Sequence, residues 1–390
     1  MTLPHTAAPV PAYGTASLSD VLPAVAAGLG LTAADGVPAT GLVLPPADRV
    51  CVFLVDGLGW ELIRSHPDDA PFLTSLLSTS LAGSGRPLTA GFPSTTATSL
   101  ASFGTGRPPG EHGLAGYLVR IPGERRLMNQ LRWMPHQTPR TWQPYPTVFG
   151  RTHAMGVSTC QVSSPLFEFT PLTEVALSGG QFLGRLTGEE RMDLAAERLA
   201  AADRALVYTY YSELDGMGHR HGVHSDAWRG QLMAVDRLAQ RLAEQLPPRS
   251  ALYITADHGM VDIAPEARID FDAPEQEDLR AGVLLLGGEG RARHVYAKPG
   301  AEADVHAAWR ERLGDRFWIA TREEAVAAGW FGPVVEERVL GRIGDVVAVA
   351  ADDTAVIATR REPGESAMVG LHGSMHPAEQ LVPLLEVRRG

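Results

Sequence analysis

The sequence predicts an α/β fold with a mostly parallel central sheet and helices on both of its faces. Short runs of apolar residues recur along the chain, each followed by polar turn residues, and helical periodicity appears between them. Runs that are apolar at every position are typical of parallel strands buried between helix layers. Strand, turn and helix in alternation is the order expected of an α/β sheet.

Apolar runs at five places supply the predicted strands. The first ends in Asp56-Gly57, and the others also run into polar residues. Each has the length of a single buried strand. In chain order the runs are residues 49–55, 157–162, 205–211, 251–255 and 346–350.

Helical periodicity is clearest between the third and fourth runs. Apolar residues there recur at intervals of three or four and form a single stripe over residues 226–246. Such a stripe predicts an amphipathic helix packed against the sheet. The stripe consists of Trp228, Leu232, Val235, Leu238, Leu242 and Leu246.

Composition divides the rest of the chain. Residues 1–14 are rich in Ala, Pro and Thr and are predicted to form a loose N-terminal arm. Residues 288–345 combine a strand-like run and helical stretches with Gly- and Pro-rich edges, which indicates a small inserted α+β subdomain. Residues 15–287 and 346–390 together then form the main domain.

Composition also excludes several classes of function. Lys298 is the only lysine among the 390 residues and has no Gly-Lys-Ser/Thr around it, which excludes a P-loop nucleotide site. The two cysteines, Cys51 and Cys160, exclude an iron–sulfur cluster, a zinc ribbon and a disulfide-stapled fold. The 13 histidines are therefore the main supply of soft metal ligands.

Charge and hydropathy limit the partners and the compartment. A formal net charge of -11 argues against a nucleic-acid duplex or an anionic membrane surface as a partner. The N-terminal segment lacks the basic and apolar regions of a secretory signal. No run approaches the roughly 18 apolar residues of a membrane span. The predicted compartment is the cytoplasm, and the sequence gives no sign of the oligomeric state.

Acidic residues follow three of the apolar runs: Asp56, Asp215 and Asp257. An Asp-Gly pair alone is ordinary turn chemistry. The pattern gains meaning because His219 stands four residues after Asp215 and His258 directly follows Asp257. In such sheets ligands bind at the carboxyl ends of strands. Carboxylates and imidazoles without thiolates suit zinc, with manganese as the harder alternative.

A hydroxyl-rich stretch, residues 91–100, follows the first run. It reads Gly-Phe-Pro-Ser-Thr-Thr-Ala-Thr-Ser-Leu, and its tail can form a helix. A threonine at the start of such a helix has a positive local field and free N–H groups, which suits an anion-binding nucleophile. Simple helix capping is the alternative. Because no Ser-His-Asp order or Gly-x-Ser-x-Gly elbow is present, activation of this hydroxyl would fall to a metal ion.

A late His-Gly turn offers further ligands. His372-Gly373 precedes a short predicted helix and a last apolar strand, and His376 lies four residues further on. Each histidine is either an ordinary surface residue or the one that completes a ligand set.

Together these motifs resemble the alkaline phosphatase superfamily, and most of all its branch of type I phosphodiesterases and nucleotide pyrophosphatases. The resemblance extends from about residue 49 to residue 386. It implies an alkaline phosphatase-like fold for the main domain and two divalent metal ions, most simply Zn²⁺, with Mn²⁺ as the alternative. The family's nucleophile falls on Thr96 rather than Thr95.

The resemblance also implies two ligand sets, and the ions of two-metal sites lie about 3.5–4 Å apart. The first ion is expected to contact Thr96. Thr96 is expected to attack phosphorus and form a phospho-threonine, with its backbone N–H stabilising a phosphoryl oxygen. The implied ligands are Asp56, Asp257 and His258 for the first ion, and Asp215, His219 and His372, rather than His376, for the second.

The chain departs from its relatives in two respects. Diesterases of this branch often carry Asn a few residues after the nucleophile, where Ser99 stands here, so Ser99 is the candidate substrate-binding residue. Phosphonoacetate hydrolases are expected to grip the substrate carboxylate with lysines, whereas this chain has only Lys298.

The sequence therefore predicts a metal-dependent hydrolase of phosphodiester or pyrophosphate bonds, acting on a small-molecule phosphate ester or a nucleotide. A phosphomonoesterase or a phosphonate (C–P) hydrolase with the same core is the enzyme alternative. The remaining alternative is a non-catalytic binding protein with this fold.

Overall fold

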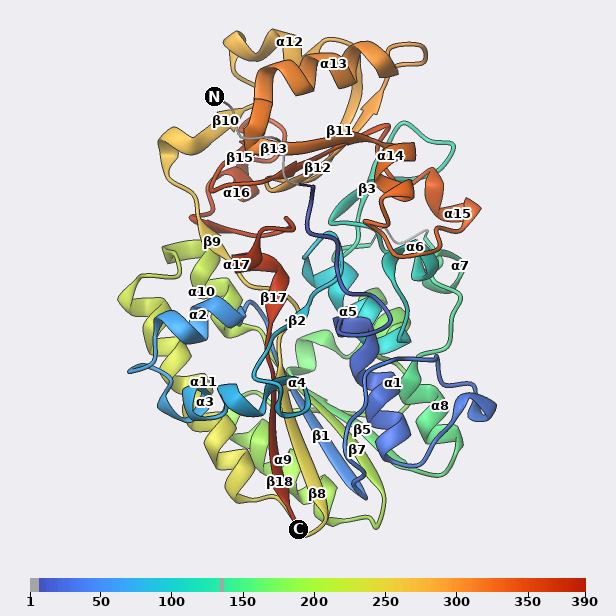
Figure 1. Cartoon of the computed structure of the whole chain (residues 1–390), viewed down its shortest axis with the longest axis vertical. Helices are drawn as coiled ribbons and strands as arrows, with labels where there is room; N and C mark the ends of the chain where they lie inside the picture. Colours follow the sequence, from blue (N-terminus) through green and yellow to red (C-terminus); the bar gives the residue numbers. More distant parts are fainter. Residues whose placement is uncertain (1–6, 134–136) are drawn as a thin grey trace.

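The central sheet confirms the predicted fold class. The computed structural model describes residues 7–133 and 137–390, so residues 1–6 of the predicted arm lie outside the described residues. The strands lie in the order β18-β8-β1-β7-β5-β6 (Figure 1), and every neighbouring pair is parallel except β18 with β8. Their bounds are β1 (Arg49–Val55), β5 (Ser158–Ser163), β6 (Gln181–Gly184), β7 (Ala205–Tyr211), β8 (Ser250–Thr255) and β18 (Leu384–Arg389).

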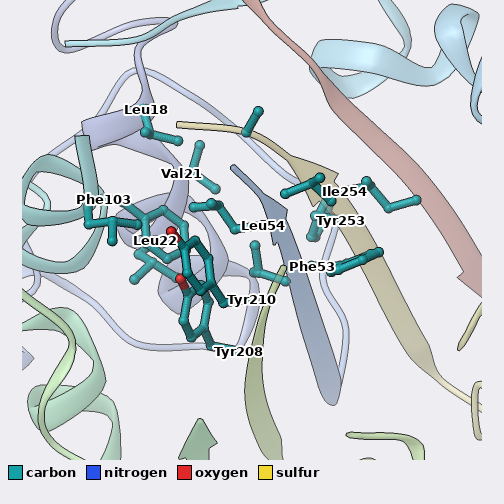
Figure 2. Close-up of a cluster of buried hydrophobic side chains, with 14 of the residues drawn as sticks. Leu18, Val21, Leu22, Phe53, Leu54, Phe103, Tyr208, Tyr210, Tyr253 and Ile254 are labelled. Carbon is teal, nitrogen blue, oxygen red and sulfur yellow. The ribbon is translucent and has the colours of Figure 1, made fainter. Parts of the chain in front are cut away.

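Helices cover both faces of this sheet, because successive side chains of its strands point to opposite sides. Tyr208 and Tyr210 point to one face, where the Phe103 ring lies 5.6 Å from that of Tyr208, between centroids, and α1 packs beside them (Figure 2). Tyr211 points to the other face, where the Arg191 guanidinium of α9 lies 5.4 Å from its ring centroid. The main helices are α1 (Leu18–Gly28), α5 (Thr96–Thr105), α9 (Gly188–Ala200) and α11 (Asp226–Glu244), the last of which is the predicted amphipathic helix.

A second sheet, antiparallel throughout, lies above the first in Figure 1. Its strands lie in the order β11-β12-β14-β13, and α13 packs against it through Trp309. The bounds are β11 (Val283–Glu289), β12 (Ala292–Ala297), β13 (Phe317–Thr321), β14 (Val346–Ala350) and α13 (Glu302–Leu313).

The prediction of a central strand at residues 346–350 is wrong, because this run forms β14 of the second sheet. Alternate residues of β14 face two apolar cores, one around Trp309 and the other around Phe331. A strand that is buried on both faces is apolar at every position, whether its sheet is parallel or antiparallel. The composition of such a strand therefore does not indicate which sheet it joins. The second sheet thus extends beyond residues 288–345 on both sides, and the division of the chain into domains stays a prediction.

A buried ion pair joins the second sheet to the C-terminal segment. Arg291 lies in the turn between β11 and β12, and its Nε donates to Glu379 Oε1 at 3.0 Å. Both side chains are fully buried. The other Glu379 oxygen accepts from the Ser374 N–H at 2.8 Å. The ion pair therefore holds the turn between β11 and β12 against the segment that follows His372.

The carboxyl ends of the parallel strands face the second sheet. β18 runs antiparallel to β8 and leads to the C-terminus, which lies at the end of the molecule away from the second sheet (Figure 1). β8 and its parallel neighbours run the other way, so they end between the two sheets.

Shorter elements complete the described chain. The shorter helices are α2 (Trp60–Ser65), α3 (Pro71–Ser75), α4 (Ser80–Gly83), α6 (Pro109–His112), α7 (Pro139–Trp142), α8 (Val148–Ala154), α10 (Glu213–His221), α12 (Glu277–Arg280), α14 (Arg322–Ala327), α15 (Glu337–Leu340), α16 (Pro363–Ser366) and α17 (Pro377–Gln380). The paired short strands are β2 (Leu88–Thr89) with β17 (Leu381–Val382), β3 (Leu118–Arg120) with β4 (Leu127–Asn129), β9 (Val261–Asp262) with β16 (Gly370–Leu371), and β10 (Arg268–Asp270) with β15 (Ala355–Ile357). Within residues 7–133 and 137–390, no helix has the length and apolar character needed to cross a membrane.

Candidate active site

Three aspartates meet where β1, β7 and β8 end. Asp56 directly follows β1, Asp257 follows β8, and Asp215 lies in the first turn of α10, just after β7. Gly57 permits this approach, because it has a φ of 75° and a Cβ there would lie 3.2 Å from the Asp215 Cα. The Gly57 N–H also donates to Asp257 Oδ1 at 3.1 Å. One turn therefore holds the three carboxylates close together.

Asp56, Asp257 and His258 form the first candidate ligand group, with ligand atoms within 4.8 Å of one another. His258 Nε2 lies 3.3 Å from Asp56 Oδ1 and 3.5 Å from Asp257 Oδ2. The Nδ1 of His258 lies 2.9 Å from the Gly259 carbonyl oxygen. Because a carbonyl only accepts, Nδ1 carries the proton and Nε2 keeps a lone pair for a metal ion.

Asp215, His219 and His372 form the second candidate group. His219 lies one turn after Asp215 on α10, and its Nε2 is 3.4 Å from Asp215 Oδ1. The His372 Nε2 is 4.0 Å from the same oxygen. The Nδ1 of His219 bonds the Gly370 carbonyl at 2.8 Å. That of His372 bonds the Ser94 carbonyl at 2.9 Å. Both imidazoles therefore offer Nε2 as a ligand.

The chemistry of the two groups fits divalent cations. They adjoin, because the rings of His258 and His372 stack with centroids 3.6 Å apart. Within the described residues, one oxygen each of Asp56, Asp215 and Asp257 is buried without a hydrogen-bond partner, which is costly for an ionised carboxylate. Burial, and then repulsion from the other two aspartates, raises the pKa of Asp56 well above its usual value. Burial and the neighbouring imidazoles lower the pKa of His372. Bound cations would stabilise ionised carboxylates and neutral imidazoles together.

Thr96 begins α5 and lies beside the first group. Its Oγ1 is 3.3 Å from His258 Nε2. Thr95 is the N-cap residue of the helix, and its hydroxyl donates instead to Glu289 Oε2 at 3.1 Å. The geometry therefore places the hydroxyl of Thr96, rather than that of Thr95, beside the first ligand group, with the free N–H groups of the first helical turn next to it.

Two residues that the sequence analysis named as candidates, Ser99 and His376, do not lie at the two ligand groups. Ser99 is fully buried in α5 and lines neither of the cavities described next, because this helix is buried from its second residue onward. The role of Ser99 in substrate binding therefore stays a prediction. His376 is the N-cap residue of α17, where its Nδ1 accepts from the Ala378 N–H at 3.4 Å, and it lies outside both ligand groups.

Two cavities open on Thr96 and Asp215, and Arg132 lines both. The smaller, of about 210 Å³, is rich in carboxylates. The larger, of about 340 Å³, is mainly apolar. Their other lining residues come from loops, from the second sheet and, in the larger cavity, from the central strands β5, β6 and β7. They carry no motif and were not anticipated from the sequence. They include Tyr117, Glu289, Arg293, Glu362 and Glu365 in the smaller cavity, and Leu131, Phe167, Leu172, Phe182 and Tyr210 in the larger.

Tyr210 is expected to hold Asp56 in position for a metal ion. Its hydroxyl donates to Asp56 Oδ2, and burial raises the pKa of Tyr210 well above its usual value, so it remains a donor. Tyr210→Phe is expected to weaken divalent metal binding about 10- to 100-fold, the effect of losing such a supporting hydrogen bond. Competition with a chromogenic chelator measures this.

The matched control is Tyr208→Phe. Tyr208 lies on the same face of β7, and its buried hydroxyl has no hydrogen-bond partner in the described part of the chain. This variant is expected to bind metal like the wild type. Equal weakening in both variants would contradict the role assigned to Tyr210.

The strand order, the paired Asp/His groups and the threonine at a helix start fit the alkaline phosphatase superfamily, and the match to a family model places the chain there. A family model for type I phosphodiesterase / nucleotide pyrophosphatase matches residues 50–375. The chain belongs to this family, whose enzymes act on phosphoric esters and anhydrides.

Known proteins share the fold. Murine ectonucleotide pyrophosphatase / phosphodiesterase 5 is 17% identical, with a TM-score of 0.67 over 86% of this chain and 87% of that one. An inactive variant of it has been solved in complex with AMP. Phosphonoacetate hydrolase from Sinorhizobium meliloti 1021, in complex with phosphonoformate, is 18% identical, with a TM-score of 0.64 over 88% of this chain and 91% of that one. Human ectonucleotide pyrophosphatase/phosphodiesterase family member 7 is 33% identical over 136 residues, which span 30% of this chain and only 30% of that relative.

Proposed function

We propose that this protein hydrolyses phosphodiester or pyrophosphate bonds of small molecules, nucleotides among them, with Thr96 as nucleophile and two divalent cations as cofactors. The position of Thr96 carries the proposal. Its hydroxyl begins a helix and lies 3.3 Å from His258 Nε2 in one ligand group, with the other group adjoining. The AMP complex of the murine relative supports a nucleotide substrate.

The two ligand groups would hold one cation each. Bound there, the cations supply positive charge that lowers the pKa of a hydroxyl and stabilises charge on phosphoryl oxygens. Carboxylates and imidazoles suit Zn²⁺, with Mn²⁺ as the alternative. The proposed ligands are Asp56, Asp257 and His258 for one ion and Asp215, His219 and His372 for the other.

The residues of the chain perform the displacement in two steps. Thr96 Oγ1 attacks phosphorus, and the departing oxygen leaves with the electron pair of the P–O bond and takes up a proton. Water then hydrolyses the phospho-threonine ester and restores the hydroxyl. The N–H groups of the first turn of α5 donate to a phosphoryl oxygen, where the helix dipole favours negative charge.

A phosphonate substrate is the alternative, because the fold is shared with phosphonoacetate hydrolase. The smaller cavity is lined by Glu289, Glu362 and Glu365 and also by Arg132 and Arg293, but not by Lys298. The carboxylate of such a substrate would be bound by these arginines.

Three substrates separate these functions. Purified, metal-loaded protein is assayed with bis(4-nitrophenyl) phosphate, 4-nitrophenyl phosphate and phosphonoacetate. Preference for the diester is the expected result. Preference for the monoester would reject the diesterase assignment, and phosphate release from phosphonoacetate would favour C–P cleavage.

Removing divalent metal is expected to abolish activity and to lower thermal stability, and the loss of stability is expected to grow as rising pH ionises Asp56 and Asp257. Burial raises the pKa of both aspartates. The folded, metal-free protein therefore keeps these protons to a higher pH than the unfolded chain does, and its stability falls as the pH rises through the raised pKa values. His372, whose pKa is lowered, is neutral in both states above neutral pH and adds no slope there.

The melting temperature of chelator-treated protein, with and without added Zn²⁺, measures this effect. The stabilisation by Zn²⁺ is expected to increase as the pH rises and Asp56 and Asp257 ionise. A Zn²⁺ effect that does not change with pH would contradict the expectation.

A further inference from the structure

The segment before Thr96 is clamped to the segment around His372. Ser94, two residues before Thr96, is fully buried and forms an isolated antiparallel bridge with Gly373. Its N–H donates to the Gly373 carbonyl at 3.1 Å, and its hydroxyl donates to the Ser374 carbonyl at 2.6 Å. Its own carbonyl accepts from His372 Nδ1 at 2.9 Å. Every polar group of Ser94 is therefore bonded to this one segment.

Residues 372–374 are a rigid partner for this clamp. The Ser374 N–H donates to Glu379 Oε2 at 2.8 Å, and Glu379 is itself held to the second sheet by a buried ion pair. The Ser374 hydroxyl donates to the carbonyl of Ala350 in β14. Ser374 is fully buried as well. The Ser94 hydroxyl thus ties the segment before Thr96 to a point that the second sheet holds in place.

The clamp closes a ring of contacts around the site. The Ser94 carbonyl bonds the His372 imidazole, whose ring stacks on that of His258 with centroids 3.6 Å apart. His258 Nε2 lies 3.3 Å from Thr96 Oγ1, and the chain from Thr96 back to Ser94 completes the ring. His258 belongs to the first ligand group and His372 to the second. A shift of Ser94 would therefore move the Thr96 hydroxyl and a ligand histidine together.

We propose that Ser94 is a positioning residue, whose hydroxyl holds Thr96 and the second ligand group in register. The inference rests on the proposed function, because it takes Thr96 as the nucleophile and His372 as a metal ligand. Hydrogen bonds that orient ligating histidines support metal affinity. The geometry of attack is sensitive to shifts of about 1 Å. The Ser94 hydroxyl acts on both through the backbone that it fixes.

Ser94→Ala tests the inference, since it removes the hydroxyl and leaves the backbone carbonyl that bonds His372. In the metal-loaded variant, kcat with bis(4-nitrophenyl) phosphate is expected to fall about tenfold while KM stays within about twofold, because the lost bond changes the geometry of attack and not substrate binding. The Zn²⁺ affinity, measured by competition with a chromogenic chelator, is expected to fall about tenfold for one of the two ions. The inference is overturned if either kcat or Zn²⁺ affinity is unchanged.

Ser102→Ala is the matched control, because Ser102 is a fully buried serine of α5 that also makes a side-chain hydrogen bond. Its Oγ lies 3.0 Å from His112 Nε2, and neither residue belongs to a ligand group. This variant is expected to keep kcat and Zn²⁺ affinity within about twofold of the wild type. Equal losses in both serine variants would overturn the role of Ser94. The melting temperature of each metal-loaded variant establishes that it is folded.

The wild type separates this inference from the proposed function. No turnover of the diester by the metal-loaded wild type would overturn the proposed function, while the Zn²⁺ affinity of Ser94→Ala still tests the link between Ser94 and the second ligand group. Turnover by the wild type together with an unchanged kcat in Ser94→Ala would overturn the inference alone.

Discussion

Thr96→Ala is expected to lower kcat about a thousandfold or more, the scale of effect seen when a nucleophile is removed. The variant retains the ligand groups and the helix N–H donors but has no oxygen to attack phosphorus. The measurements are kcat with bis(4-nitrophenyl) phosphate and mass spectrometry of quenched reactions, in which the wild type is expected to carry a phosphorylated Thr96 peptide. Bound metal and melting temperature establish that the variant is folded.

Thr95→Ala is the control for this substitution, since it removes the neighbouring hydroxyl. It loses the hydrogen bond to Glu289 and is expected to reduce kcat less than about tenfold, the cost of one such bond. A larger loss in Thr95→Ala than in Thr96→Ala would assign the nucleophile to Thr95.

Arg291→Met is expected to lower the free energy of unfolding by about 3–5 kcal/mol, because it leaves the fully buried Glu379 carboxylate without its cation. The guanidinium also bonds the backbone carbonyls of Asp352 and Thr354, which lose their donor as well. Denaturant unfolding of the metal-loaded protein, followed by circular dichroism, measures the change.

Two further variants control for the loss of charge. In the double variant Arg291→Met/Glu379→Gln no unpaired charge remains buried, and the loss of stability is expected to be smaller than in the single variant. Arg64→Met removes an ion pair with Glu61 whose side chains are 55% and 39% exposed, and is expected to cost less than about 0.5 kcal/mol. If Arg64→Met destabilised the protein as much as Arg291→Met, burial of the ion pair would not be the cause of the expected loss of stability.

The central part of the fold could be predicted because its signals are local. A fully buried strand must be apolar at every position, and β1 and β7 span the predicted residues 49–55 and 205–211. The strand at residues 346–350 has the same pattern but a different partner, since pairing depends on distant residues that a local pattern does not contain.

The ligand groups could be anticipated for a related reason. Carboxyl ends of parallel strands converge, so residues that follow them, such as Asp56 and Asp257, are placed together by topology alone. The burial of Ser99 could not be anticipated, because a hydroxyl near the start of a helix gives no information on which side of that helix is buried. Glu289 and Arg132 carried no signal, since only the packing of loops and of the second sheet brings them to Thr96.

The bond between the Ser94 carbonyl and His372 joins residues 278 positions apart, and this has a consequence for biosynthesis. A nascent chain that has emerged through the second sheet already contains Thr96 and five of the six proposed ligands, yet it lacks His372. Closing so long a loop is slow compared with forming local helices. The second proposed ligand group is therefore expected to be completed only late in synthesis, after the second sheet has emerged.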